Sequence, residues 1–196
     1  MNRVTVGRVK RLAAVAAVLM LVTACSDEPP RLHDPGYGAG RGIYDTRPDT
    51  PYTFHEMTLC LNEPGSAVVT DVAPIEPAGG FEVLGFSVLP VEGPFVGHLG
   101  EPTQRMADAG YPADGPMVVD DVCPDEQSGE GGTVFTLAVE VAHTDPAAGS
   151  ASGFLVTYES GGETLTVVKP FGISLCAAPQ QDPPPPECET RIVEPD

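Results

Sequence analysis

The stretch "TVFTLAVEVAHT", residues 133–144, alternates large apolar side chains with small or polar ones. From Phe135 to Val141 every second residue is phenylalanine, leucine or valine, and the residues between them are threonine, alanine and glutamate. A period of two is typical of a β-strand that places one face on a core and the other toward solvent. The stretch therefore predicts a half-buried strand.

Strand-like stretches continue on both sides of it. They are "YTFHEMTLCLN" (52–62), "AVVTDVAPIE" (67–76), "FEVLGFSVLPVE" (81–92), "GFLVTYES" (153–160) and "ETLTVVKPFGISLC" (163–176). Gly161 and Gly162 predict a hairpin between the last two stretches. Pro170 predicts an edge position or a break, because proline cannot donate to a ladder. One short helix is expected near residues 103–110, with Gly110 as its C-terminal cap.

Strands of this length and spacing, with almost no helical pattern, predict an all-β domain over residues 52–177. The architecture that we expect is an immunoglobulin-like two-sheet sandwich with disulfides. Residues 25–51 are rich in proline, glycine and charge, and we expect them to form a disordered tether. Residues 178–196 contain four consecutive prolines and predict a proline-rich acidic tail.

The first 24 residues have the features of an export signal. Four basic residues within the first eleven precede the uncharged run "LAAVAAVLMLVTA" (12–24). About a dozen apolar residues predict a secretory signal, because a membrane-spanning helix needs roughly 20. The end of the run, "LVTAC" (21–25), resembles the lipobox of bacterial lipoproteins. This resemblance implies that residues 1–24 are removed and that Cys25 carries the lipid, which anchors the protein on the extracytoplasmic face of the cell membrane.

The segment "PFGISLC" (170–176) closes the last predicted strand. An exported lipoprotein with a cysteine-bearing sandwich that ends in this way is similar to actinobacterial lipoproteins of unknown function. That similarity implies no activity and transfers no site residue to this chain.

The charge of the chain excludes one class of partner. The 196 residues include 10 basic and 28 acidic ones, for a net charge of -18. Residues 1–24 contain four of the basic residues and none of the acidic ones, so the charge after cleavage is 6 − 28 = −22. Phosphate groups repel such a protein, which argues against nucleic acids and against direct recognition of anionic headgroups.

Four cysteines remain besides Cys25, and an even number in an exported domain predicts two disulfides. Three pairings are possible from sequence alone. The contexts "TLCLN" and "SLCAA" on the first and last predicted strands favour Cys60 with Cys176, which leaves Cys123 with Cys188.

Catalysis finds little support in the sequence, and we expect neither an enzyme nor a cofactor. The stretch "GSASG" (149–153) has the wrong spacing for a nucleophile elbow, which is G-x-S-x-G. The acidic residues are abundant, but they are not grouped as a paired general acid and base.

Two metal sites are alternatives. His55 and Met57 are two residues apart and are expected on one strand face, where an imidazole and a thioether would suit copper. Residues 120–130 gather Asp120, Asp121 and further carboxylates in a predicted loop that would suit calcium, although the spacing is not that of an EF-hand. The structural interpretation, without a metal, is that Met57 packs in the core and that the acidic run is solvated.

The sequence therefore predicts a membrane-anchored lipoprotein whose sandwich is a binding or interaction module for an envelope protein or a glycan. An exported metal-binding protein is the alternative.

Overall fold

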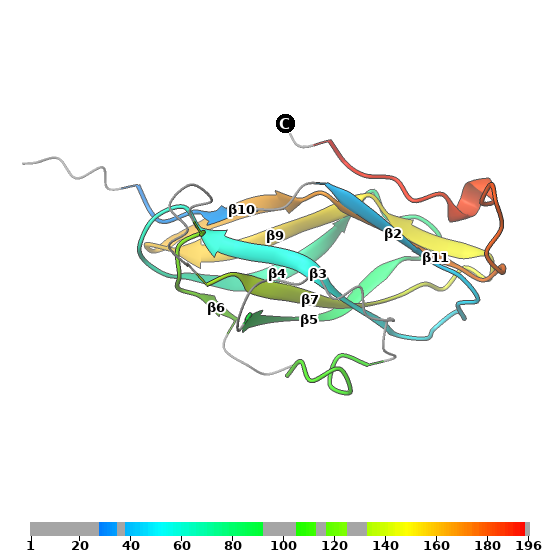
Figure 1. Cartoon of the computed structure of the whole chain (residues 1–196), viewed down its shortest axis with the longest axis horizontal. Helices are drawn as coiled ribbons and strands as arrows, with labels where there is room; N and C mark the ends of the chain where they lie inside the picture. Colours follow the sequence, from blue (N-terminus) through cyan, green and yellow to red (C-terminus); the bar gives the residue numbers. More distant parts are fainter. Residues whose placement is uncertain (1–27, 35–37, 92–104, 113–116, 125–132, 195–196) are drawn as a thin grey trace, which may run out of the picture.

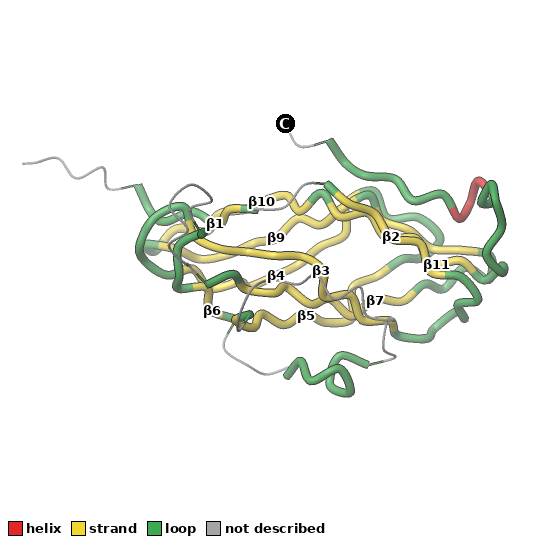
Figure 2. The backbone as a smooth tube through the Cα atoms, in the orientation of Figure 1, coloured by secondary structure: helices red, strands yellow, loops and turns green. Residues whose placement is uncertain are grey.

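The computed structural model of the chain describes residues 28–34, 38–91, 105–112, 117–124 and 133–194. The predicted signal peptide and Cys25 lie outside these residues. The described elements, shown in Figures 1 and 2, are β1 (Leu32–His33), β2 (Ala39–Ile43), β3 (Tyr52–Leu61), β4 (Ala67–Ile75), β5 (Glu82–Pro90), β6 (Val118–Val119), β7 (Phe135–Ala142), β8 (Ala148–Ala151), β9 (Gly153–Ser160), β10 (Glu163–Lys169), β11 (Phe171–Cys176) and the 3-10 helix η1 (Pro186–Cys188).

Two antiparallel four-stranded sheets form the body. Their strand orders are β1-β3-β7-β5 and β10-β9-β4-β6. With β1, β3, β4, β5, β7, β9 and β10 as strands A to G, these are the ABED and GFC sheets of an immunoglobulin-like sandwich, and β6 is a two-residue addition beside strand C. The predicted fold class is confirmed.

The second sheet continues into a smaller one beyond Pro170. The strand β11 follows this proline and pairs with β8 on one side and, in parallel, with β2 on the other. Since Pro170 separates β10 from β11, the predicted break is confirmed. The hairpin of β9 and β10 is also confirmed, with Gly161 and Gly162 both at positive φ.

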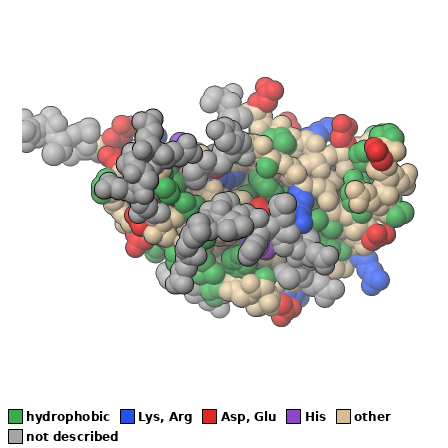
Figure 3. Space-filling model, viewed as in Figure 1, with side chains coloured by type: hydrophobic (Ala, Val, Ile, Leu, Met, Phe, Trp, Pro, Cys, Tyr) green, Lys and Arg blue, Asp and Glu red, His purple; other side chains and the backbone are tan. Residues whose placement is uncertain are grey.

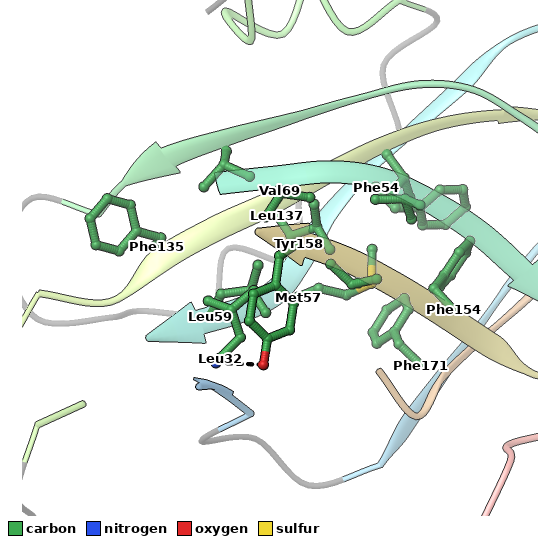
Figure 4. Close-up of a cluster of buried hydrophobic side chains, with 14 of the residues drawn as sticks. Leu32, Phe54, Met57, Leu59, Val69, Phe135, Leu137, Phe154, Tyr158 and Phe171 are labelled. Atoms are coloured by element: carbon green, nitrogen blue, oxygen red, sulfur yellow. Dashed lines mark hydrogen bonds between the residues drawn. The ribbon is translucent and has the colours of Figure 1, made fainter. Parts of the chain in front are cut away.

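The core lies between the sheets, where aromatic and aliphatic side chains from both meet (Figure 4). Phe54, Leu137 and Phe154 are at most 1% exposed. The phenol of Tyr158 reaches across the core and accepts a hydrogen bond from the backbone N–H of Leu32 at 3.2 Å, the dashed line in Figure 4. Burial of one such aromatic or leucine side chain contributes about 1.5–3 kcal/mol.

The strand β7 is buried on both faces, so its prediction as half-buried was wrong. All eight of its residues are buried, including the outward-facing Ala138 and Glu140. The strand lies between β3 and β5, and a segment of the β5–β6 connection lies over its outer side. Alternation of side chains predicts two faces, but it does not predict what covers the outer one.

The described part of the predicted tether belongs to the fold, which corrects the expectation of disorder. Both β1 and β2 come from residues 25–51, and they pair with β3 and β11. Gly38, Gly40 and Gly42 alternate along β2, so one face of this strand carries no side chains. Thr190 and Ile192 of the C-terminal chain lie closely against Gly40, where a Cβ would come within 2.7 Å of Thr190 Cγ2.

The C-terminal tail is fastened to the body through the disulfide at Cys188. Residues 186–194, here called the strap, run over the outer face of β11 and β2 (red in Figure 1). Ser174 Oγ donates to the carbonyl of Cys188 at 2.8 Å, and the N–H of Val193 donates to the carbonyl of Ser152 at 2.8 Å.

Both disulfides form, but the favoured pairing was wrong. The bonds join Cys60 to Cys123 and Cys176 to Cys188. Cys60 alternates with the core residues Leu59 and Leu61, so its side chain points away from the core. Cys176 likewise points outward, into a small cluster with Cys188. Because the two cysteines lie on the outer faces of opposite sheets, they cannot bond to each other.

The described part of the predicted helix, residues 105–110, is a turn rather than an α-helix. One helical hydrogen bond forms, from the N–H of Ala109 to the carbonyl of Arg105 at 3.1 Å. Gly110 ends the turn at a φ of 84°, which agrees with its predicted role as a cap.

Candidate binding surfaces

The outer side of β3, β7 and β5 is covered by residues 105–112, here called the cover, which is the green coil beside β5 in Figure 1. The N–H of Met106 donates to Glu140 Oε2 at 2.6 Å, and the Arg105 guanidinium lies 3.6 Å from Glu140 Oε1. A Cβ on Gly85 of β5 would lie 3.6 Å from Met106 Cε, an ordinary contact distance, so the methionine lies directly over this strand. The cover therefore occupies this face of the sandwich.

A polar cluster lies where the cover meets β2 and β3. Glu56 forms an ion pair with Arg41, and the rings of His55 and Tyr111 lie 5.5 Å apart. Burial raises the pKa of Glu56, and the Arg41 charge opposes this shift. Burial also raises the pKa of Tyr111, and the Glu56 charge adds to this shift. Among the described residues, Glu56 Oε2 is buried without a hydrogen-bond partner. The cluster can therefore take up a proton where three segments meet.

The buried Lys169 lies beside the connection in which the N-terminal chain passes from β1, in one sheet, to β2, in another. Lys169 is 2% exposed, forms an ion pair with Asp34 and donates to the backbone carbonyl of Thr58 in β3. Burial lowers the pKa of Lys169, and the Asp34 carboxylate opposes this shift. These contacts connect β3, β10 and the β1–β2 connection, which is a structural role.

The outer face of β10, β9 and β4 is open among the described residues. Val156 and Tyr158 face the core, so the residues that alternate with them along β9 face outward. The residues of β10 and β4 that pair with these outward residues face outward too. All of these outward residues are exposed or half-buried: Val68, Asp71, Ala73, Leu155, Thr157, Glu159, Thr164, Thr166 and Val168. We call this set the open face. It combines hydroxyl and apolar side chains with two carboxylates, and it contains no lysine or arginine.

A cleft of about 300 Å³ lies between the strap, β8 and the loops beside β8. Its charged lining residues are Asp145, Glu187, Glu189 and Arg191. The Asp145 carboxylate already accepts a hydrogen bond from the N–H of Ala147 at 2.8 Å. Three carboxylates around one guanidinium favour a polar rather than an apolar ligand. The cleft lies at the end of the sandwich opposite β1.

The predicted copper pair does not share a strand face. A β-bulge separates Phe54 from Met57 in the pairing of β3 with β7, so both of these residues face the core. Met57 is 2% exposed there, as the structural interpretation without a metal predicted. His55 lies on the other side of the strand, beside Tyr111. Within the described ranges, no group of three or more histidine, cysteine, aspartate or glutamate residues is arranged to hold a metal ion.

The acidic segment 120–130 is only partly within the described residues, which exclude 125–132. Asp121 accepts hydrogen bonds from the N–H groups of Val122 at 2.9 Å and Thr133 at 3.1 Å. A side-chain hydrogen bond with Thr133 is the main cause that lowers the pKa of Asp121. This carboxylate therefore links Val122 to Thr133, while Asp120 is exposed.

The buried His143 has a structural role. His143 is fully buried, with its Nε2 3.1 Å from Thr46 Oγ1 and its Nδ1 2.8 Å from the carbonyl oxygen of Asp145. Both ring nitrogens are therefore engaged. Ser152 of the "GSASG" stretch donates through Oγ to the carbonyl of Ile75 at 3.2 Å.

Sequence reasoning missed the open face and the cleft. A signal for the open face was present, because Thr157, Glu159, Thr164 and Thr166 occupy the polar positions of the alternating runs in the predicted hairpin. The sequence contained no signal for the cleft, because its lining residues come from loops and a strap that are far apart in the chain.

No protein-family model matches the chain, and comparisons with curated proteins and with solved structures found no match either. In the part of the chain that the structure describes, no helix is long and apolar enough to span a membrane.

Proposed function

We propose that this protein is a lipid-anchored binding module on the extracytoplasmic face of the cell membrane, without catalytic activity. The basic and apolar segments before Cys25 support export and lipidation. Two disulfides support the same compartment, because such bonds persist in oxidising surroundings.

The difference between the outer faces of the two sheets supports the choice of binding surface. The cover occupies the outer side of β7, and Glu140 there is 8% exposed. Across the molecule, Val68 is 40% exposed on the open face. A sheet face with exposed apolar and hydroxyl side chains resembles the surfaces that proteins present to partners. We therefore assign binding to the open face.

The charge of the open face indicates the chemistry of its partner. Asp71 and Glu159 are exposed on it, and the chain after the predicted cleavage carries a net charge of −22. Figure 3 also shows acidic side chains at several places along the outline of the molecule. A partner with a basic rim around an apolar or hydroxyl-rich centre would be attracted, whereas another copy of this chain would be repelled. An envelope protein of this kind is the partner that we propose.

Photo-crosslinking in the native cells tests this proposal. A benzoylphenylalanine at Thr166 probes the open face, and one at the exposed Ala107 of the cover is the matched control. We expect one envelope protein to be crosslinked from position 166 and not from position 107. The double substitution Asp71→Lys and Glu159→Lys should remove this product. Equal crosslinking from both positions, or none from position 166, would contradict the assignment.

A further inference from the structure

The first described residues are attached to one end of the sandwich. Pro29 is buried, and a Cβ on Gly161, in the β9–β10 turn, would lie 2.7 Å from Pro29 Cβ. A Cβ on Gly65, in the β3–β4 connection, would lie 2.3 Å from Pro30 Cγ. The two prolines therefore lie closely against the glycines of two turns.

Hydrogen bonds continue this attachment along the next residues. The N–H of Arg31 donates to Asn62 Oδ1 at 2.7 Å, and the N–H of Asn62 donates to the carbonyl of Arg31 at 3.0 Å. Leu32 is 5% exposed and donates its N–H to Tyr158. Residues 29–32 are thus part of the folded body.

Little chain remains between this attachment and the predicted lipid. Four residue steps separate Cys25 from Pro29, and even a fully extended chain covers at most about 14 Å over that length. A free tether over all of residues 25–51 would leave the domain mobile at a larger distance. The attachment of Pro29 restricts one end of the sandwich to the neighbourhood of the anchor.

We infer that the sandwich stands on the membrane with this end, here called the anchor end, and presents its opposite end outward. The anchor end comprises residues 62–66 and the Gly161–Gly162 turn, which adjoin one another because Ala67 pairs with Ser160. The opposite end carries η1 (Figure 2), and Pro186 and Glu187 of η1 line the cleft. The ten residues of β3 separate the two ends by about 30 Å. This inference rests on the lipidation of Cys25 in the proposed function.

The charge of the anchor end indicates how it meets the lipid. Glu28, Glu63, Asp120 and Glu163 lie at or beside its turns, with Arg31 as the cation between them. Arg31 is already paired with Glu28 at 2.7 Å. Carboxylates are repelled by anionic headgroups and are costly to bury in hydrocarbon. The anchor end therefore rests at the headgroup surface without insertion, and the open face extends from the membrane toward the outer end.

Energy transfer on vesicles tests this orientation. The full-length lipidated protein is reconstituted into phosphatidylcholine vesicles that contain a rhodamine-labelled lipid as acceptor. A donor dye is attached in separate preparations to Glu163→Cys at the anchor end and to Gln181→Cys near the outer end, both at exposed positions. Since the other four cysteines form disulfides and Cys25 is acylated, the introduced thiol is the one available for labelling.

We expect donor quenching at position 163 to exceed that at position 181 by about twofold or more, because the two ends differ by about 30 Å. The matched control carries 20 glycine and serine residues inserted between Ser26 and Asp27. A coil of that length reaches about 25 Å on average, so the difference in donor quenching between positions 163 and 181 should nearly disappear.

The outcomes separate the two proposals. Equal quenching at both positions of a protein whose mass shows the lipid on Cys25 would overturn the orientation and leave the anchor intact. A mature protein without lipid that still binds vesicles when Cys25 is replaced by alanine would overturn the anchor, and the orientation with it. Stronger quenching at position 163, lost on insertion, would support both.

Discussion

The carbonyl oxygen of Arg191 lies where a side chain on Gly172 would have to go. A Cβ at this position in β11 would come within 1.9 Å of that oxygen, which belongs to the backbone of the strap. Gly172→Ala should therefore displace the strap and lower the free energy of unfolding by about 1–3 kcal/mol. Urea denaturation measures the change. Gly85→Ala is the control, since its Cβ meets only the flexible end of Met106 at 3.6 Å. Equal stability of the two variants would contradict this account of the glycine.

Glu56 gives a second prediction at the level of one residue. Its pKa is raised above 4.5, so the folded state holds this proton to a higher pH than the unfolded chain does. Stability contributed through this group is therefore present below pH 4.5 and is lost as the pH rises through the folded pKa. Glu56→Gln removes this dependence. The stability of the wild type relative to Glu56→Gln should decrease between pH 4 and pH 7.

Urea denaturation of both proteins across that range gives the comparison. Glu82→Gln, at an exposed position in β5, is the matched control and should show no such trend. If the stability of the wild type relative to Glu56→Gln instead increased with pH, the Arg41 ion pair would outweigh burial.

At the scale of elements, each disulfide fastens a covering segment to the outer face of a strand. The bond between Cys60 and Cys123 closes a loop with a sequence separation of 63, and the bond between Cys176 and Cys188 one of 12. The longer loop restricts the unfolded chain more. Replacement of the first pair by alanine should cost about 4 kcal/mol, and replacement of the second about 3 kcal/mol. Guanidinium denaturation of the two double variants measures both losses, and the opposite order would contradict the loop argument.

The cover and the strap show how such segments decide the available surface. The cover engages Glu140 through Met106, and the strap engages Ser174 and Ser152 through its backbone. Each occupies an outer face that a bare sandwich would expose. The face over β10, β9 and β4 has no such segment among the described residues, which is why we assign binding there.

At the scale of the whole molecule, charge repulsion opposes compactness. The net charge of −22 after the predicted cleavage raises the free energy of the folded state through self-repulsion. Salt screens this repulsion, because the Debye length falls from about 30 Å at 0.01 M to about 8 Å at 0.15 M. The melting temperature of the protein without residues 1–24 should rise by about 2–4 °C over that range, equivalent to about 1 kcal/mol.

Calorimetry at two pH values checks this prediction. Partial protonation of the carboxylates at pH 4 should reduce the effect of salt. A melting temperature that fell with salt at pH 7 would mean that the surface ion pairs stabilise more than the like charges destabilise.

Local patterns were sufficient for most of the strands. Residues 135–142 alternate, Gly161 and Gly162 permit a tight turn, and Pro170 cannot donate to a ladder, so each of these features acts through its nearest neighbours. The disulfide pairing was not accessible in this way. Cys60 and Cys176 share a local context, but their side chains point away from each other on opposite sheets. The outward direction of Cys60 was implicit in the alternation of "TLCLN", whereas the segment that would meet it was not.

Periodicity, composition and short turns were sufficient to predict the class of the fold, the longer strands, the presence of two disulfides and the acidic charge. The covered face of the sandwich, the pairing of the cysteines and the pairing of β2 with β11 became known from the tertiary structure alone. Each of these depends on contacts between segments far apart in the chain: Met106 with Glu140, Cys176 with Cys188 after a proline-rich loop, and Gly40 with Thr190. The free energy of such contacts comes from the packing of both partners, so neither partner's local sequence contains it.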